Sequence, residues 1–377
     1  MLKVLSVFGT RPEAIKMAPV VKALEKCPQI LSKVAVTAQH REMLDQVLDL
    51  FQIRPDYDLN LMKHGQTLYD VTAQALTGLK EVMDREKPDL VLVHGDTTTT
   101  FVAALAAFYQ QIKVGHVEAG LRTQNKFAPF PEEMNRKLTG SLADYHFAPT
   151  ETAKENLLRE NISQENIVVT GNTVIDALLD TIEKECSLSG LGLDGVNWEK
   201  KILLVTCHRR ENWGEPMERI FRAIRQIKEQ RPETEVIFPV HKNPLVRDLV
   251  QAILGSVEGI HIVEPLDYHP FAKLMSQSFM VLTDSGGMQE EVPSLGKPVL
   301  VLRDTTERPE AVKAGTVKLV GTSQEKIIFE ALSLIDNDEV YQKMANAVNP
   351  YGDGKAAERI VSALKDFFGL DHDRLDY

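Results

Sequence analysis

The sequence predicts an α/β protein built from two doubly wound parallel-sheet domains with a ligand cleft between them. Short apolar runs of strand character alternate with helical patterns along almost the whole chain, which is typical of parallel sheets. The 377 residues exceed one typical domain and are enough to bury two cores. A Ser-Leu-Ser-Gly-Leu-Gly stretch at 187–192 has the composition of a linker, and a second series of strands and helices follows it.

The first series predicts one sheet in the N-terminal half. Residues 14–26 and 67–86 are its clearest helices, and Thr-Arg-Pro-Glu at 10–13 is a capping box with proline in the first turn. The expected strands are 3–8, 33–38, 90–94, 113–118, 145–148 and 167–170.

The second series predicts a sheet of the same kind in the C-terminal half. The expected strands are 202–206, 235–240, 260–263, 279–283, 299–302 and 317–320. We therefore expect two Rossmann-like domains, 1–171 and 172–355, and we expect the final helix, within 356–377, to pack on either of them.

Composition and missing motifs exclude several classes of protein. A hydrophobic content of 43% is ordinary for a soluble chain, and no apolar run approaches the ~20 residues of a membrane helix. A net charge of −11 argues against nucleic acid as a partner. The first strand lacks a signal-peptide cleavage site, so we expect a cytoplasmic protein with three reduced cysteines. No dinucleotide fingerprint follows the first strand of either half, which weakens the case for a bound dinucleotide, and there is neither a P-loop nor a metal-ligand spacing.

One strand-to-helix turn has the composition of a nucleotide site. Ser285, Gly286 and Gly287 follow the expected strand 279–283, where unpaired N–H groups and the absence of Cβ atoms favour an anion. Glu291 lies about one turn further on, where a carboxylate can accept bonds from ribose hydroxyls. The turn by itself fits a structural glycine turn equally well.

Three carboxylates stand at expected strand ends or helix starts in the first half. Glu118 ends an apolar strand, where an unpartnered charge is expensive to bury. Asp96 and Glu132 have ordinary structural alternatives, as a helix N-cap and as compensation of a helix dipole. Because parallel strands end at one edge, the three acids can converge, and crowded carboxylates suit proton transfer near neutral pH.

Basic residues stand at the same kind of position. Arg11 and Lys16 follow the first strand and can supply charge to a pyrophosphate, although solvated basic residues at a helix start are the commoner case. His208 ends the first strand of the second half and can meet a phosphate or a sugar. Arg308 lies in a charged loop, where it can close on phosphate or join a salt network.

Taken together, these stretches resemble the non-hydrolysing UDP-N-acetylglucosamine 2-epimerases. The resemblance implies the GT-B architecture of two-domain glycosyltransferases and interconversion of UDP-N-acetylglucosamine and UDP-N-acetylmannosamine. It also suggests a homodimer that needs no cofactor. The matching segments, in the family's order, are 8–16, 37–41, 94–97, 116–122, 131–133, 171–176, 208–212, 284–291 and 303–310.

The resemblance also implies roles for the residues. The family removes the C2 proton and expels UDP from C1, giving a 2-acetamidoglucal, and then adds UDP back with protonation on the other face. Asp96, Glu118 and Glu132 would transfer the protons, with their division of acid and base roles open. The residues implied to contact substrate or UDP are Arg11, Lys16, Arg136, His208, Phe271, Ser285, Gly286, Gly287, Glu291 and Arg308.

One departure and three alternatives stay open. Some bacterial members bind a second substrate molecule as activator through a glutamine and an arginine, where this chain has Glu42 and Gly65. Activation by substrate is therefore undecided. The alternatives to the reversible epimerase are a GT-B glycosyltransferase, a hydrolysing epimerase that frees the sugar, and a nucleotide-sugar sensor without catalysis.

Overall fold

The computed structural model describes residues 1–38, 41–61 and 65–370. Gln39 and His40 of the 37–41 motif and the last seven residues of the expected segment 356–377 lie outside the described residues. The chain divides into two compact units, residues 1–177 with 351–377, and residues 178–350. No helix in the described part of the chain combines the length and apolar character needed to cross a membrane.

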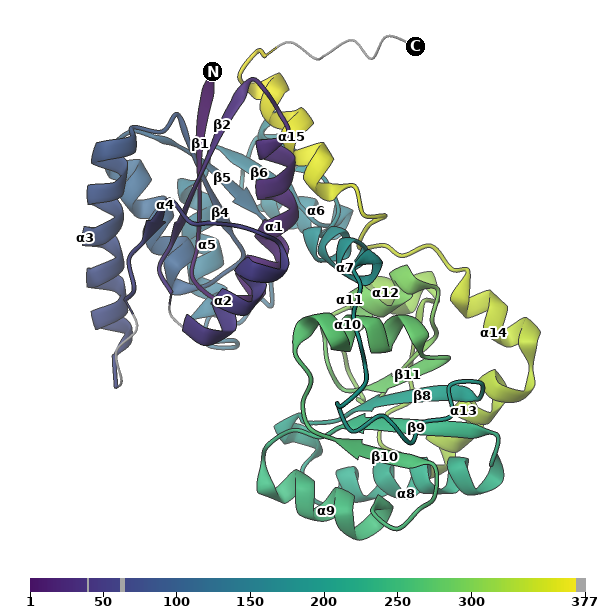
Figure 1. The fold of residues 1–377 in the computed structure, drawn as a ribbon. Helices are drawn as coiled ribbons and strands as arrows, with labels where there is room; N and C mark the ends of the chain where they lie inside the picture. The colour runs from purple at the N-terminus through teal and green to yellow at the C-terminus, as the bar shows by residue number, and fades with distance from the viewer. Residues whose placement is uncertain (39–40, 62–64, 371–377) are drawn as a thin grey trace. The chain divides into compact units, whose positions relative to one another are not determined.

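Unit 1 contains a parallel sheet of seven described strands with the order β3-β2-β1-β4-β5-β6-β7 (Figure 1). The order reverses between β1 and β4, which makes the carboxyl ends of these two strands the topological switch point. The strands are β1 (Leu2–Phe8), β2 (Ile30–Val36), β3 (Tyr57–Asp58), β4 (Leu90–His94), β5 (Lys113–Val117), β6 (Tyr145–Ala148) and β7 (Ile167–Val169).

Helices cover this sheet, and the last of them returns from the far end of the chain. Helix α15 (Ala356–Phe367) packs against α1 (Arg11–Glu25), where the start of α15 is held by the buried carboxylate of Asp176 through the N–H groups of Ala356 and Ala357 (Figure 1). The remaining helices are α2 (Arg41–Leu50), α3 (Leu68–Glu86), α4 (Thr98–Tyr109), α5 (Glu132–Leu142), α6 (Glu151–Arg159) and α7 (Thr173–Glu183), which crosses the boundary between the units.

Unit 2 contains a parallel sheet of six described strands with the order β10-β9-β8-β11-β12-β13. Its order reverses between β8 and β11, so a second switch point lies there. The strands are β8 (Lys201–Thr206), β9 (Thr234–Pro239), β10 (Ile260–Val263), β11 (Met280–Thr283), β12 (Val299–Val301) and β13 (Val317–Leu319). The helices are α8 (Glu215–Gln230), α9 (Pro244–Leu254), α10 (Tyr268–Gln277), α11 (Met288–Glu291), α12 (Pro309–Ala314), α13 (Gln324–Asp336) and α14 (Asp338–Ala345).

The predicted fold class of two doubly wound α/β units is confirmed, and among the local differences from the expected elements two concern strands β2 and β3. Strand β2 begins at Ile30 rather than 33, because it pairs in register along the whole of β1. Strand β3 was not expected: it is two residues long, too short to show a hydrophobic period, and only its pairing with β2 makes it a strand. In each unit, alternate apolar side chains of the strands pack with helices into a core, and many of the strand residues between them are buried as well, as parallel strands covered on both faces require.

Candidate active site

In unit 1, the expected site residues follow adjacent strands at the carboxyl edge of the sheet. Arg11 and Lys16 lie on α1 directly after β1, Asp96 follows β4, and Glu118 follows β5. Because β4 pairs with both β1 and β5, these segments are neighbours in space. The edge they share contains the switch point, which is where open α/β sheets bind ligands.

Glu118 is a half-buried carboxylate held by two donors. Lys16 forms an ion pair with its Oε2, and the Nδ2 of Asn172 donates to the same oxygen over 2.9 Å. The backbone of Glu118 has φ +60°, a left-handed conformation that turns the chain out of β5. The Nε2 of His94 lies 3.9 Å from this oxygen, but burial lowers the pKa of His94 to about 4, so its ring is neutral at pH 7. Lys16 therefore supplies positive charge beside the Glu118 carboxylate, and Asn172 adds a neutral hydrogen bond.

Asp96 is not the N-cap that its position suggested. Thr97 caps α4, and its side chain accepts from the N–H of Thr100. The carboxylate of Asp96 instead forms an ion pair with Arg136 on α5, and Asn135 donates to its backbone carbonyl over 3.0 Å. The acid is thus tied to α5 and not to the helix it precedes.

Gly95 brings the Asp96 and Glu118 segments together. It has φ +70°, and a Cβ built on it would lie 3.7 Å from the Oε1 of Glu118. The Nε2 of His116 donates to the Gly95 carbonyl over 2.7 Å. Burial lowers the pKa of His116 to about 3, so this ring is a neutral structural donor. The loop that carries Asp96 is fixed beside Glu118.

Glu132 opens α5, one helical turn before Arg136, so both side chains project from one face of the helix. Its side chain makes no hydrogen bond or ion pair with another described residue. Its neighbour Glu133 is fully buried, accepts from the N–H groups of Thr123 and Gln124, and lies 3.3 Å from the Nη1 of Arg136. Arg136 is therefore the cation that connects α5 to Asp96.

Glu13 is a buried acid for which the sequence indicated only a capping role. Besides closing the capping box with Thr10, its carboxylate accepts from the N–H of Gly9 and from the hydroxyls of Thr97 and Thr100, at 2.6 to 3.1 Å. Burial raises its pKa. Glu13 thereby joins the loops after β1 and β4, next to Arg11, whose side chain has no ion-pair partner among the described residues.

In unit 2, the expected residues also lie at a switch point. His208 follows β8, and the turn at 284–287 follows β11, which pairs with β8. The His208 ring lies against that of His241, with centroids 5.8 Å apart and planes 16° apart. Burial lowers the pKa of His208, although nearby Asp284 opposes the shift. Cys207, which precedes His208, is buried, and burial raises the pKa of its thiol.

The Ser-Gly-Gly turn is tightly organised. The N–H of Ser285 donates to the hydroxyl of Thr283 over 2.9 Å, whereas the N–H groups of Gly286 and Gly287 make no backbone hydrogen bond within the described residues. A Cβ on Gly287 would lie 3.2 Å from the Oε1 of Glu291, and one on Gly286 would lie 3.7 Å from the Nη2 of Arg209. Larger side chains would crowd the space over the turn.

The charged loop after β12 is an ion-pair network. Arg303 is buried and pairs with Glu211 and with Glu307, whose pKa it holds down at about 2. Arg308 pairs with Glu290, which is buried one residue before Glu291. Arg308 is thus fixed beside the turn by a carboxylate.

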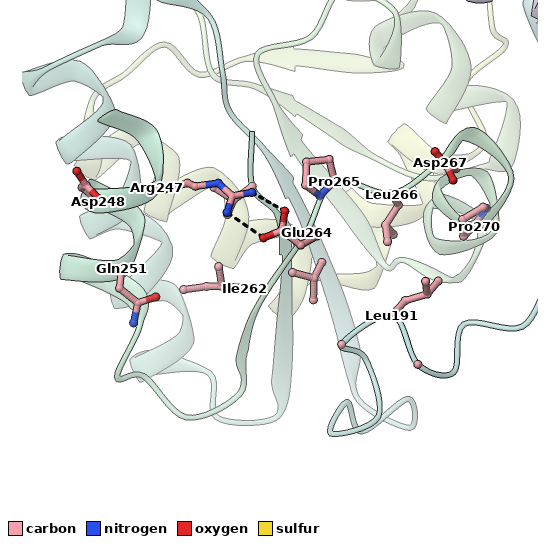
Figure 2. A pocket seen from close by; sticks show the side chains of 14 residues that line it. Leu191, Arg247, Asp248, Gln251, Ile262, Glu264, Pro265, Leu266, Asp267 and Pro270 are labelled. Carbon is pink, nitrogen blue, oxygen red and sulfur yellow. Dashed lines mark hydrogen bonds and ion pairs between the residues drawn. The ribbon is translucent and has the colours of Figure 1, made fainter. Parts of the chain in front are cut away.

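Phe271 lies in the first half of α10, half-buried, and its neighbour Pro270 borders a cavity of about 750 Å³ beside the edge strand β10 (Figure 2). Figure 2 shows Arg247 of α9 reaching Glu264 across this cavity, and two contacts of 2.9 Å or less join them. Leu191 of the linker-like stretch lies on the other side of the cavity. The cavity is lined within unit 2.

Comparison with known proteins gives one family. The model of the UDP-N-acetylglucosamine 2-epimerase family matches residues 22–365. A Bacillus subtilis UDP-N-acetylglucosamine 2-epimerase is 57% identical over 375 residues, covering 100% of this chain and 98% of the relative. A Listeria monocytogenes crystal structure is 56% identical, with a TM-score of 0.93 and 100% and 99% coverage.

A crystal structure of the Neisseria meningitidis UDP-GlcNAc 2-epimerase, bound to UDP-GlcNAc, has 55% identity, a TM-score of 0.85, and 97% and 100% coverage of the two chains. These relatives match the chain over both of its units. The chain therefore belongs to the UDP-N-acetylglucosamine 2-epimerase family.

Proposed function

We propose that the chain interconverts UDP-N-acetylglucosamine and UDP-N-acetylmannosamine by eliminating UDP to 2-acetamidoglucal and adding it back, and that it supplies sugars for cell-surface polysaccharides. The observation that carries the proposal is the arrangement of acids at the switch point of unit 1. Asp96 and Glu118 follow paired strands, and each has a cation on its carboxylate. A family relative with 55% identity binds UDP-GlcNAc.

The acids of unit 1 would do the chemistry on the hexose. Removal of a C2 proton needs a carboxylate base, and protonation on the other face needs an acid. We assign these two roles to Glu118 and Asp96, with Glu132 tuning them. Lys16 balances the charge of Glu118 in the free enzyme and can shift toward the pyrophosphate when substrate arrives. Arg11 would add a second positive charge.

The switch point of unit 2 would bind the nucleotide. The N–H groups of Gly286 and Gly287 and the hydroxyl of Ser285 would bind phosphate, and Glu291 would accept bonds from the ribose. Arg308 would add positive charge. His208 would meet the departing pyrophosphate, and Phe271 would pack against the uracil ring.

The deciding experiment is incubation of the enzyme with UDP-N-acetylglucosamine in heavy water, followed by proton NMR. We expect both UDP-sugars to appear, with deuterium replacing the proton at C2 of each, and no free sugar. Accumulation of free N-acetylmannosamine would identify a hydrolysing epimerase. Sugar transfer to an added acceptor would indicate a glycosyltransferase. Binding of the UDP-sugar without deuterium at C2 would indicate a nucleotide-sugar sensor without catalysis.

We also propose a homodimer through the layer of helices α3, α4 and α5 of unit 1. These neighbouring helices expose large apolar side chains to solvent: Tyr69 (87%), Tyr109 (66%), Phe108 (55%), Leu68 (45%) and Leu138 (41%). A set of this size on adjacent elements is typical of a protein interface.

Sedimentation velocity should show a dimer, and the double variant Phe108→Lys, Tyr109→Lys should weaken its association at least tenfold, about 1.4 kcal/mol. Phe329→Lys on α13 is the matched control, because Phe329 is 69% exposed in unit 2. A monomeric wild type, or equal effects of the two substitutions, would contradict the assignment of this interface.

A further inference from the structure

Asp284 is a buried acid at the centre of the unit 2 switch point. It follows β11 directly and is 0% exposed. Its Oδ2 accepts three hydrogen bonds, from the N–H groups of His208 (2.9 Å) and Arg209 (2.8 Å) and from the Nδ2 of Asn212 (3.1 Å). One oxygen of this carboxylate thus fixes the whole loop that follows β8.

The second oxygen of Asp284 faces the imidazole. The Nδ1 of His208 lies 3.3 Å from Oδ1, at ion-pair distance, and Oδ1 accepts no well-aligned hydrogen bond from any described residue. A buried carboxylate oxygen without a donor is costly. A small rotation of the ring aligns an Nδ1–H on Oδ1, and such bonds are often long before substrate binds.

Among the described residues, three other polar or charged groups lie around the imidazole of His208: Cys207, Arg209 and His241. The Cys207 thiol is also close to Asp284 and stays protonated, because burial and the carboxylate raise its pKa. Arg209 and His241 both disfavour a positive charge on His208, while Asp284 favours it. The carboxylate is therefore the group that can hold a proton on one particular nitrogen of the ring.

We propose that Asp284 is a positioning residue that keeps a proton on the Nδ1 of His208 and leaves Nε2 as the nitrogen that exchanges a proton with the ligand. Nε2 is on the opposite edge of the ring from Nδ1, and the side chain of His208 is 39% exposed. The inference deepens the proposed function and rests on it for the identity of the ligand.

The proton balance is simple. The negative pyrophosphate favours uptake of a proton at Nε2, which makes an imidazolium that donates to a phosphate oxygen. When the bond between C1 of the sugar and the phosphate oxygen breaks, its electron pair stays on the departing UDP. The proton on Nε2 of His208 can then pass to UDP. The ring is then neutral, with its Nδ1 proton unchanged, and Asp284 remains ionised throughout. This is the division of roles found in acid–histidine pairs of hydrolases.

The test is Asp284→Asn with nitrogen-15 NMR of the histidine rings. The asparagine oxygen can still accept from the two backbone N–H groups, but its NH₂ would face Nδ1 and turn that atom into an acceptor. We expect the His208 proton on Nδ1 in the wild type and on Nε2 in the variant. The kcat should fall at least 100-fold with little change in KM. The limb of the pH–rate profile that belongs to His208 should move to lower pH.

Two further variants separate positioning from folding. Asn212→Ala removes a donor to Oδ2 and leaves the Oδ1–Nδ1 contact, so it should lower stability while the tautomer of His208 is kept. Asp338→Asn replaces an exposed acid of α14 and should change neither the stability of the protein nor the tautomer of His208.

A proton on Nε2 in the wild type, or an unchanged tautomer in Asp284→Asn, would overturn the inference. If Asp284→Asn does not fold, the wild-type spectrum alone still shows which nitrogen of His208 carries the proton and so tests the inference. Absence of deuterium at C2 in the wild type would reject the proposed function, while the tautomer measurement would stand independently.

Discussion

We expect the Glu118→Gln variant to lose the exchange of the C2 proton with solvent. Glutamine keeps the size of the side chain and can still accept from Asn172, but it cannot take up a proton and cannot form the ion pair that Glu118 makes with Lys16. Loss of a general base costs about 10²- to 10⁴-fold in rate. The measurement is deuterium incorporation at C2 by proton NMR, alongside the rate of epimerisation.

Two comparisons make this result specific. Glu155→Gln, on an exposed acid of α6 that pairs with Arg159 one turn away, should have the wild-type rate. UDP should still bind Glu118→Gln at least as tightly as the wild type, because the proposed nucleotide-binding residues of unit 2 are untouched and Lys16 no longer pairs with a carboxylate at position 118. Retained exchange in Glu118→Gln would remove this residue from proton transfer and leave Asp96 as the first candidate.

Gly120→Ala is expected to be the most destabilising single substitution near the site. Gly120 has φ +88°, and a Cβ on it would lie 2.2 Å from the backbone carbonyl oxygen of Ala153 on α6. Backbone cannot move aside as a flexible side chain can. Left-handed strain and overpacking together should cost at least about 3 kcal/mol of unfolding free energy, which urea denaturation would measure.

Gly190→Ala is the matched control for this effect. Gly190 has φ +76°, but a Cβ on it would meet no described atom within 4 Å. This substitution carries the conformational strain alone, about 1 kcal/mol. Equal losses of unfolding free energy in Gly120→Ala and Gly190→Ala would show that the contact with α6 does not restrict the residue at position 120.

Much of the architecture was readable from local pattern. Apolar runs of strand length, separated by helical periods, predicted both parallel sheets, and the capping box at Thr10 was found where α1 begins. Strand β3 escaped prediction because two residues carry no period. The structural alternative for Asp96, a helix cap, follows from an N-cap preference that is local, whereas the ion pair that Asp96 forms with Arg136 spans 40 residues.

The sequence by itself determined the fold class, the edge of each sheet where polar residues gather, and the family resemblance, because these depend on residue order and short-range periodicity. Only the tertiary structure decided which partner each charged side chain has: Lys16 pairs with Glu118, Arg308 pairs with Glu290, and Asp284 accepts from the backbone N–H of His208. The physical reason is that a buried charge takes its partner from whichever strand or helix packs beside it, and spacing along the chain does not encode that neighbour.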